Sequence, residues 1–198
     1  MKNLLRLASI LILAILALGC AAGSANMRVV PESEAAYAPT SDRALVIFMR
    51  PSRFGGAIQS AIFDTTTQEN KLVGIVSAKT KVAYSVAPGE HMFMVVGENA
   101  DFMGANLVAG KTYYAVVRAR MGVWKARFSL YPVHKSELGS SEFENWVSSC
   151  SYVENTDDSC TWARNNAADI QAKREAYIVK WEEKPDSDKP MLRPEDGV

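Results

Sequence analysis

Few residues of this 198-residue chain have the types and spacing that catalysis requires. The two histidines, His91 and His134, stand apart, and for neither can a nucleophile and an orienting acid be named. The acid pairs Asp157-Asp158 and Glu182-Glu183 lie in turn and helix-end compositions, where solvated carboxylates are more common than a glycosidase pair. Gly55-Gly56 lacks the lysine and the following helix of a phosphate-binding loop. The sequence therefore predicts a protein that is not an enzyme and has no cofactor, with a structural role for His91.

A group of cations is the stronger chemical candidate, and its members are Arg118, Arg120, Lys125 and Arg127. On two strands joined by a tight turn, alternation places all four side chains on one face, with Arg118 directly opposite Lys125. Like charges in that position destabilise a sheet, so the face requires either acidic neighbours or an anionic ligand. Glu90, Glu98 or the acidic C-terminal region would serve as neighbours, and we interpret the face first in this way. A possible anion-binding face is the alternative.

The elements that position these cations are two strands, 112–120 and 123–131, joined by Met121-Gly122. A two-residue turn sets the register of the strands that it joins. The resulting pairs are Tyr113 with Leu130, Ala115 with Phe128, Val117 with Ala126, and Ala119 with Trp124. All four pairs are apolar, so the face opposite the cations is predicted to pack into a core.

Apolar runs rich in β-branched and aromatic residues predict earlier strands at 44–49, 57–64, 71–77 and on both arms of 81–95. The first run is apolar at every position, which is typical of a central strand buried on both faces. Pro88-Gly89 suits a type II turn, so 81–95 is predicted to be a hairpin. The segment 97–106 is predicted to be an irregular loop above Phe102 and Met103. The fold class is therefore mainly β, a small antiparallel β-sandwich of about 7–8 strands over residues 44–133.

The spacing of apolar residues changes after residue 133. Ser141 and Glu144 match a capping box, which predicts a short helix through Trp146. Residues 162–184 are rich in Ala, Glu, Lys and Arg, carry an apolar stripe and precede a proline, so they predict a long amphipathic helix. Residues 186–198 contain two prolines and are predicted to be frayed. Residues 134–198 thus form a predicted C-terminal α-helical extension.

Charge is divided unevenly between these two parts. The chain has 22 basic and 22 acidic residues and is 48% hydrophobic, which fits one globular domain. Residues 44–133 carry ten Lys and Arg against five acids, net +5, and residues 134–198 carry eight against fourteen, net −6. This division permits the extension to dock on the sandwich.

The N-terminus predicts export. Lys2 and Arg6 precede the twelve apolar-rich residues 7–18, a run that is too short for a membrane-spanning helix, which needs about 20 residues. We interpret residues 1–19 as a signal peptide. Residues 20–43 are rich in Ala, Ser, Pro and Glu and are predicted to be a flexible tether.

The end of this signal, Ala17-Leu18-Gly19-Cys20, resembles a bacterial lipobox. The resemblance implies that Cys20 is the lipid attachment site and the mature N-terminus; ordinary cleavage after about Ala22 is the alternative. Ala21 after the cysteine resembles the sorting position of outer-membrane lipoproteins. The implied location is the bacterial outer membrane, facing the periplasm, with a lipid anchor in the membrane.

The other two cysteines, Cys150 and Cys160, would then meet an oxidising compartment. They are close in sequence, and the intervening Asn155-Thr156-Asp157-Asp158 has a turn composition. We predict that they form a disulfide bond, which would contribute somewhat under ~3 kcal/mol on the chain-entropy model. A metal site would need further Cys or His nearby, and none is present in the sequence around them.

Three stretches in order resemble a family of bacterial envelope lipoproteins whose function is not known. They are Arg50-Pro51-Ser52-Arg53-Phe54, Val86-Ala87-Pro88-Gly89-Glu90-His91 and Leu107-Val108-Ala109-Gly110-Lys111-Thr112-Tyr113-Tyr114. The proline-glycine turn is also similar to PEGA-like and transthyretin-like modules. The resemblance covers 44–133 and implies a small β-sandwich without catalysis.

Two functions from different classes follow. The first is a non-enzymatic, lipid-anchored envelope protein whose β-sandwich or C-terminal helix binds another envelope protein or gives structural support. The alternative is a binding module for an anionic envelope glycan or lipid, such as peptidoglycan or lipopolysaccharide, through the basic strand face. An exported chain does not suit nucleotide chemistry, and no nucleic-acid partner is predicted.

Overall fold

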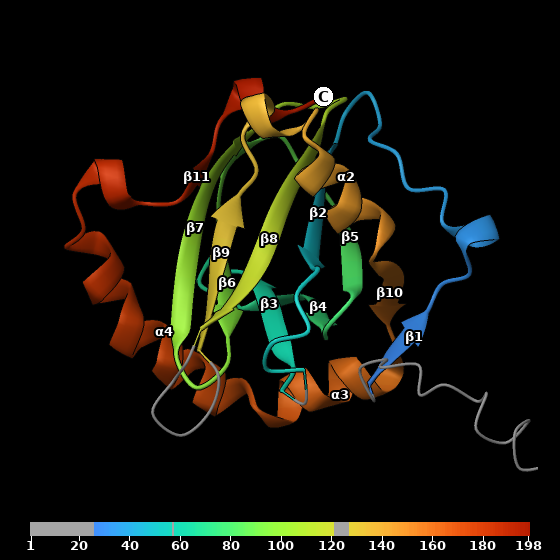
Figure 1. Ribbon diagram of the computed structural model, residues 1–198. Helices are drawn as coiled ribbons and strands as arrows, with labels where there is room; N and C mark the ends of the chain where they lie inside the picture. The colour runs from blue at the N-terminus through green and yellow to red at the C-terminus, as the bar shows by residue number, and fades with distance from the viewer. Residues whose placement is uncertain (1–25, 57, 121–126) are drawn as a thin grey trace, which may run out of the picture.

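Two mixed β-sheets packed face to face form the centre of the structure (Figure 1). The computed structural model describes residues 26–56, 58–120 and 127–198. Within them the chain is mainly β and has a C-terminal helical part, as predicted. Cys20 and Lys125 lie outside the described residues.

The sheets have the strand orders β1-β10-β5-β2-β8-β9 and β11-β7-β6-β3-β4. The first contains β1 (Met27–Val29), β2 (Ala44–Arg50), β5 (Thr80–Val86), β8 (Thr112–Arg120), β9 (Arg127–Pro132) and β10 (Ser151–Asn155). The second contains β3 (Ser60–Asp64), β4 (Lys71–Val76), β6 (Gly89–Val96), β7 (Ala100–Leu107) and β11 (Met191–Leu192).

The prediction of an antiparallel sandwich of seven or eight strands is wrong in both respects for the described residues. Three pairs are parallel, namely β2 with β8, β5 with β10 and β7 with β11. The additional strands β1, β10 and β11 come from segments that were predicted to be tether or helical extension. Each adds to the edge of a sheet, where a strand that arrives from far along the chain can pair in either direction.

Strand β2 is the central buried strand that the sequence predicts. It lies between β5 and β8, and all seven of its residues are buried. Val46 and Phe48 point into the core between the sheets, whereas Leu45 and Ile47 belong to a smaller apolar cluster on the outer face. Helix α2 (Ser141–Ser148) covers that cluster, which explains why both faces of β2 are apolar.

Helix α2 begins one residue earlier than predicted. The capping side chain is Ser140, whose Oγ accepts a hydrogen bond of 3.1 Å from the backbone N–H of Phe143. Ser141, the predicted cap, is instead the first helical residue.

The Pro88-Gly89 turn joins the two sheets and does not form the predicted hairpin. Strand β5 pairs with β2 and β10, whereas β6 pairs with β3 and β7. Gly89 has φ +114°, a conformation that favours glycine, so the local turn chemistry is as expected. The partners of the two arms are set by packing beyond the turn.

Strands β6 and β7 form a hairpin where an irregular loop was predicted. Their pairing runs from Gly89 opposite Leu107 to Val96 opposite Ala100. Phe102 is 1% exposed. The strand was not predicted because the many polar residues of 97–106 are typical of a loop.

The β8–β9 pair keeps the predicted faces but has another register. Val117 lies opposite Leu130 and Ala119 opposite Phe128, a shift of four residues from the predicted pairing. Six residues, 121–126, separate the strands and lie outside the described residues, as does the predicted Met121-Gly122 turn. An even shift leaves every side chain on its face, so the apolar core face is confirmed for the described positions.

The predicted tether over 20–43 is wrong for β1, which pairs antiparallel with β10. Met27 and Val30 are buried, and the Val30 N–H donates to the Tyr152 carbonyl at 2.9 Å. A 3₁₀ turn, Glu32–Glu34, follows. The segment pairs here because the edge of β10 offers unpaired backbone N–H and C=O groups, and the pairing places its apolar side chains against the sandwich.

The predicted helix 162–184 is two helices, α3 (Asp157–Asn165) and α4 (Ala167–Glu182), which meet at Asn166. They pack on the outer face of the five-stranded sheet, α3 on β4 and α4 on β6 and β7. The buried side chains on that face of β6 and β7 include Met94 and Phe102.

The C-terminal segment is docked on the sandwich, and the predicted frayed end is wrong. Leu192 of β11 is fully buried. Asp196, 3% exposed, accepts hydrogen bonds from the backbone N–H groups of Lys135 and Arg193 and lies 3.1 Å from Nδ1 of His134. Val198 and Thr112 exchange two backbone hydrogen bonds. The remaining 3₁₀ turns are Lys135–Glu137, Asp186–Asp188 and Pro194–Asp196.

Cys150 and Cys160 are both free in this structure, so the predicted disulfide between them stays a prediction. Cys150 is buried in the smaller apolar cluster, and Cys160 lies in α3.

Candidate functional site

The cations of the basic face lie where alternation along the strands predicts. Arg118 and Arg120 of β8 and Arg127 of β9 point away from the core. Arg120 is directly opposite Arg127, and Arg118 is opposite Ser129, in place of the predicted Arg118–Lys125 pair. A like-charged pair therefore exists, but at another position.

Acidic residues of the β6–β7 hairpin neutralise two of these cations. Nε of Arg127 lies 3.4 Å from Oε1 of Glu98, and Nη2 of Arg120 lies 3.6 Å from Oδ2 of Asp101. Glu98 was one of the predicted neighbours, whereas Asp101 takes the place expected for Glu90 or the C-terminal region. This pairing offsets the repulsion between the two arginines.

Arg118 is held differently. Its guanidinium carbon lies 3.4 Å from the centre of the Tyr131 ring, and it forms no ion pair with a described carboxylate. Burial, together with a hydrogen bond to Glu137, raises the pKa of Tyr131, which therefore stays a neutral ring. The Arg118 guanidinium also hydrogen-bonds with the Tyr131 side chain, and an arginine stacked in this way can still offer its remaining N–H groups to a planar anion.

Arg118 lines a groove of about 390 Å³ between β8 and α2. The polar and aromatic lining comes from Ser52, Lys79, Glu142, Asn145 and Trp146. Nζ of Lys79 donates to the Ser149 hydroxyl at 3.1 Å and pairs with none of the described carboxylates. The groove thus brings together two cations without acidic partners, one carboxylate, one amide and a half-buried indole.

Sequence reasoning missed Lys79 and Trp146. Lys79 has φ +63°, which is unusual for a residue other than glycine, and its backbone is held by bonds to Arg50 and Ser151. Trp146 reaches the groove because α2 packs across β2. Neither position carries a local signal for binding.

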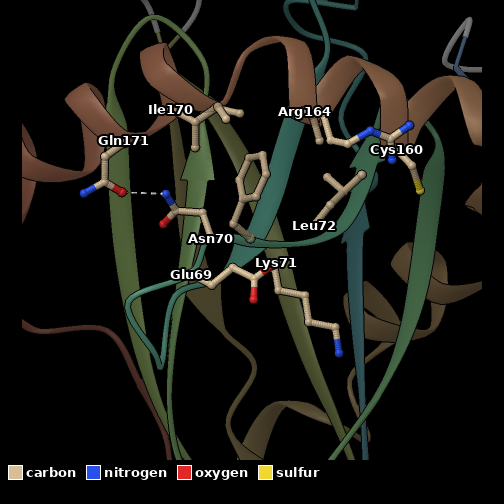
Figure 2. Close-up of a pocket in the computed structure, with 11 residues that line it drawn as sticks. Glu69, Asn70, Lys71, Leu72, Cys160, Arg164, Ile170 and Gln171 are labelled. Carbon is tan, nitrogen blue, oxygen red and sulfur yellow. Dashed lines mark hydrogen bonds between the residues drawn. The ribbon is translucent and has the colours of Figure 1, made fainter.

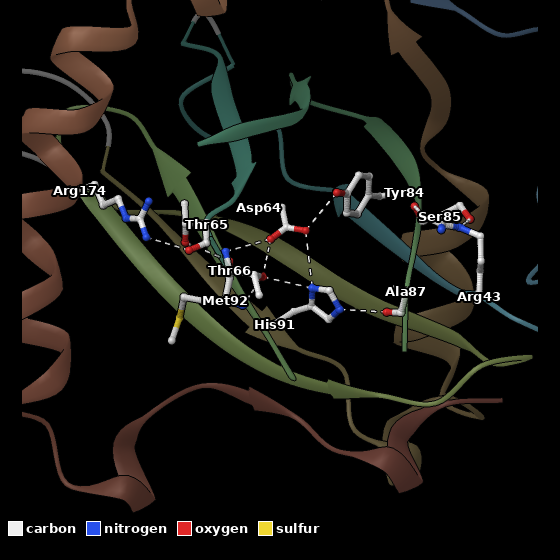
Figure 3. A network of polar contacts seen from close by, with 10 residues as sticks. All are labelled: Arg43, Asp64, Thr65, Thr66, Tyr84, Ser85, Ala87, His91, Met92 and Arg174. Atoms are coloured by element: carbon white, nitrogen blue, oxygen red, sulfur yellow. Dashed lines mark hydrogen bonds and ion pairs between the residues drawn. The ribbon is translucent and has the colours of Figure 1, made fainter. Parts of the chain in front are cut away.

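A second polar cluster surrounds His91 between the two sheets (Figure 3). Nδ1 of His91 lies 3.6 Å from Oδ2 of Asp64 and 3.1 Å from the Thr66 hydroxyl, and Nε2 donates to the Ala87 carbonyl at 2.9 Å. The Tyr84 hydroxyl donates to Asp64 at 3.0 Å. Both ring nitrogens are therefore engaged, and the cluster ties β5 of one sheet to β3 and β6 of the other.

The electrostatics of this cluster favour a charged pair. Burial alone would raise the pKa of Asp64, but hydrogen bonds from His91, Thr66 and Tyr84 outweigh it and hold that pKa well below its usual range. The hydrogen bond to Asp64 raises the pKa of His91. Burial and the nearby carboxylate raise the pKa of Tyr84, which remains a neutral donor.

Replacement of His91 by asparagine is expected to lower stability most at mildly acidic pH. Because the folded pKa of His91 is raised, its contribution is complete below the unfolded value of about 6.5 and is lost as pH rises through the folded value. We expect a loss of about 1 kcal/mol near pH 6 that shrinks toward pH 9. Urea unfolding of both proteins across pH 5–9 measures this difference. A difference that does not change with pH would contradict the charged pair.

A third region is a hollow of about 590 Å³ between the outer face of the five-stranded sheet and helices α3 and α4 (Figure 2). Its apolar lining includes Phe63, Leu72 and Ile170, and Lys71 is turned away from it (Figure 2). Nδ2 of Asn70 donates to Oε1 of Gln171 at 2.8 Å across one side. These amides satisfy each other, so they direct no free polar group at a ligand.

The helix beside this hollow is held by one arginine. Nη2 of Arg174 in α4 donates to the carbonyls of Thr65 and Thr67, and Nη1 donates to Gln68 and Asn70. This arginine fastens the β3–β4 loop to α4. The contact between the five-stranded sheet and α4 is therefore polar at the β3–β4 loop and apolar at its centre.

The fold and the groove define the class: a two-sheet β-sandwich with an exposed aromatic and cationic groove. No protein-family model matches the sequence, and no curated protein matches it. Across 26–56, 58–120 and 127–198, no group of three or more His, Cys, Asp or Glu side chains could hold a metal ion. None of the helices in this part of the chain is long and apolar enough to cross a bilayer.

Proposed function

We propose that the protein is a non-enzymatic, lipid-anchored protein of the bacterial cell envelope whose groove between β8 and α2 binds an anionic envelope glycan. The observation that carries this proposal is the presence of Arg118 and Lys79, without ion-pair partners among the described residues, beside Trp146. Sugar rings stack on indole faces, and arginine binds carboxylate or phosphate groups through two N–H donors. Glu142 and Asn145 supply hydrogen-bond partners for hydroxyl and acetamido groups.

A protein partner is less well supported by the surface. The exposed large apolar side chains of the described residues are Val29, Phe54, Val108, Val179, Met191 and Val198. These six are few, whereas a protein interface usually has a contiguous apolar centre. Binding to another envelope protein is thus the second candidate.

The anchor and the location rest on residues 1–20. Cys20 as the mature N-terminus, with its acyl chains in the outer membrane, is supported by the sequence before it. The intact mass of the mature protein tests this assignment, because Cys20 without acyl mass would contradict it.

Cosedimentation with purified peptidoglycan tests the groove. We expect the double replacement Arg118→Gln and Lys79→Gln to weaken binding at least tenfold, because each lost charged hydrogen bond is worth about 1.5–3 kcal/mol. Lipopolysaccharide provides a second arm that distinguishes the two glycans.

The matched control is the double replacement Arg120→Gln and Arg127→Gln on the same face. These two cations are paired with Asp101 and Glu98, so we expect less than a twofold change. Equal losses in the two variants would indicate general attraction to the basic face. Absence of binding by the parent protein to either glycan would exclude the proposed ligand.

A further inference from the structure

The Lys81 side chain is a buried cation that forms no ion pair with a carboxylate of the described residues. Lys81 of β5 is only 7% exposed, and its Nζ donates one hydrogen bond, of 2.7 Å, to the Val147 carbonyl. The ammonium group has three donors, so two have no hydrogen-bond partner among the described residues. Unsatisfied donors of a buried charge are costly, which makes this position unusual.

The groups around Lys81 do not neutralise it. Burial raises the pKa of the Cys150 thiol, which therefore stays uncharged beside the amine. Burial also raises the pKa of Tyr152 to about 12, and the neutral ring lies 4.3 Å from Nζ. Glu32 is exposed and forms no ion pair with Lys81. Burial in turn lowers the pKa of Lys81 itself.

Lys81 lines a pocket of about 440 Å³ between the N-terminal segment and strand β10. One wall is Val29, Val30, Pro31, Glu32 and Ala35, and the other includes Val147, Ser148, Cys150, Ser151 and Tyr152. The walls therefore combine apolar and polar groups; the buried charged group among them is the amine of Lys81, whereas Glu32 is exposed. Ligand sites commonly combine such an apolar lining with a few polar groups.

We propose that this pocket binds a small organic monocarboxylate, with one carboxylate oxygen on Nζ of Lys81 and an apolar body against the valine walls. A single negative charge matches the one cation of the described lining, whereas a phosphate dianion would bring a second negative charge that no second lysine or arginine there balances. The ring of Tyr152 can cover an aromatic or branched body. This site is separate from the groove beside α2 and uses a different strand.

Thermal unfolding of the full chain with benzoate and butyrate tests the proposal. We expect each at about ten times its dissociation constant to raise the midpoint by about 2–4 °C. Benzamide and butyramide, which keep the shape without the charge, are expected to give no rise, and chloride at equal ionic strength controls for salt. A rise with the amides, or none with either carboxylate, overturns the proposal. A rise with inorganic phosphate equal to that with benzoate also overturns it.

Variants locate the effect. Lys81→Met keeps the length of the side chain and removes the charge, so benzoate should no longer raise the midpoint. Lys71→Met, at an exposed lysine outside the pocket, should behave like the parent. A rise in Lys81→Met equal to that of the parent places benzoate elsewhere and overturns the site.

Chemical labelling gives a second readout that does not need a folded variant. Reductive methylation mapped by peptide mass should be slowed at least fivefold by benzoate at Lys81 and not at Lys71. An unchanged rate at Lys81 would contradict the contact with Nζ. Neither test involves the groove or a glycan. A negative result for benzoate would therefore not bear on the proposed function, which the cosedimentation experiment tests separately.

Discussion

Replacement of Gly197 by alanine is expected to lower the free energy of unfolding by about 2–3 kcal/mol. A Cβ atom at this position would lie 2.5 Å from Cζ of Tyr113, far inside van der Waals contact. Tyr113 is fully buried, and its hydroxyl accepts from the Val108 N–H and donates to the Pro194 carbonyl, so the ring cannot move away. The strain is relieved only if the C-terminal segment leaves its place, which exposes Leu192.

Gly139→Ala is the matched control, because no atom lies within 4 Å of a Cβ built there. We expect its stability to stay within about 0.5 kcal/mol of the parent. Urea unfolding of the three proteins gives the comparison. If Gly197→Ala is as stable as the parent, the C-terminal segment does not pack on Tyr113.

Replacement of Arg50 by methionine is expected to cost about 3 kcal/mol or more. Arg50 is fully buried and donates to the carbonyls of Phe54, Gly55 and Ile58 at 3.0, 2.7 and 2.5 Å. Its guanidinium carbon also lies 4.7 Å from the centre of the Phe128 ring. Methionine fills much of the same volume but removes these donors. The Gly55 carbonyl keeps a hydrogen bond from the Ile58 N–H, whereas the Phe54 and Ile58 carbonyls lose the arginine, and each unsatisfied group costs about 1–3 kcal/mol.

Arg53→Met is the matched control in the same loop. Arg53 is exposed and makes no contact that holds the loop, so we expect a change within about 0.5 kcal/mol. Equal stability of the Arg50 and Arg53 variants in urea would show that the gain from removing a buried charge offsets the lost hydrogen bonds. Nε of Arg50 has no hydrogen-bond partner among the described residues and contributes to that opposing effect.

Local patterns predicted the strands and their faces well. The run 44–49 became β2, and the alternation in 112–131 placed Ala115, Val117 and Phe128 in the core and Arg118 outside it. These predictions succeed because side chains alternate along a strand whatever the strand pairs with. The same reason explains why a register error of four residues left the faces of β8 and β9 intact.

Pairing between distant segments could not be predicted in this way. Pro88-Gly89 makes a local turn, but Phe93 packs on Phe48 with ring centres 5.0 Å apart, in the core between two sheets. Strand β10 pairs with the edge of β5 that β2 leaves free, and no residue of 151–155 indicates this pairing. Likewise, no sequence pattern indicated that a strand, β10, and the start of helix α3 lie between the two cysteines.

The residues of the candidate sites also fall into those that local patterns identified and those that only tertiary packing brought together. Arg118, Arg120 and Arg127 were identified from strand alternation alone, and Glu98 was named as a neighbour for the basic face. Lys79, Trp146 and the buried Lys81 gain their surroundings from helix α2 and strand β10, which pack on the sheet from beyond residue 134.

By itself the sequence determined the mainly β class, the central strand β2 and the outward direction of the arginines on β8 and β9. The tertiary structure decided which strands pair, which cations keep a free charge and where the C-terminal segment docks. The physical reason is that side-chain alternation and turn preference act over a few residues, whereas burial and ion pairing depend on segments far apart in the chain, such as Arg28 and Glu154, which are 126 residues apart.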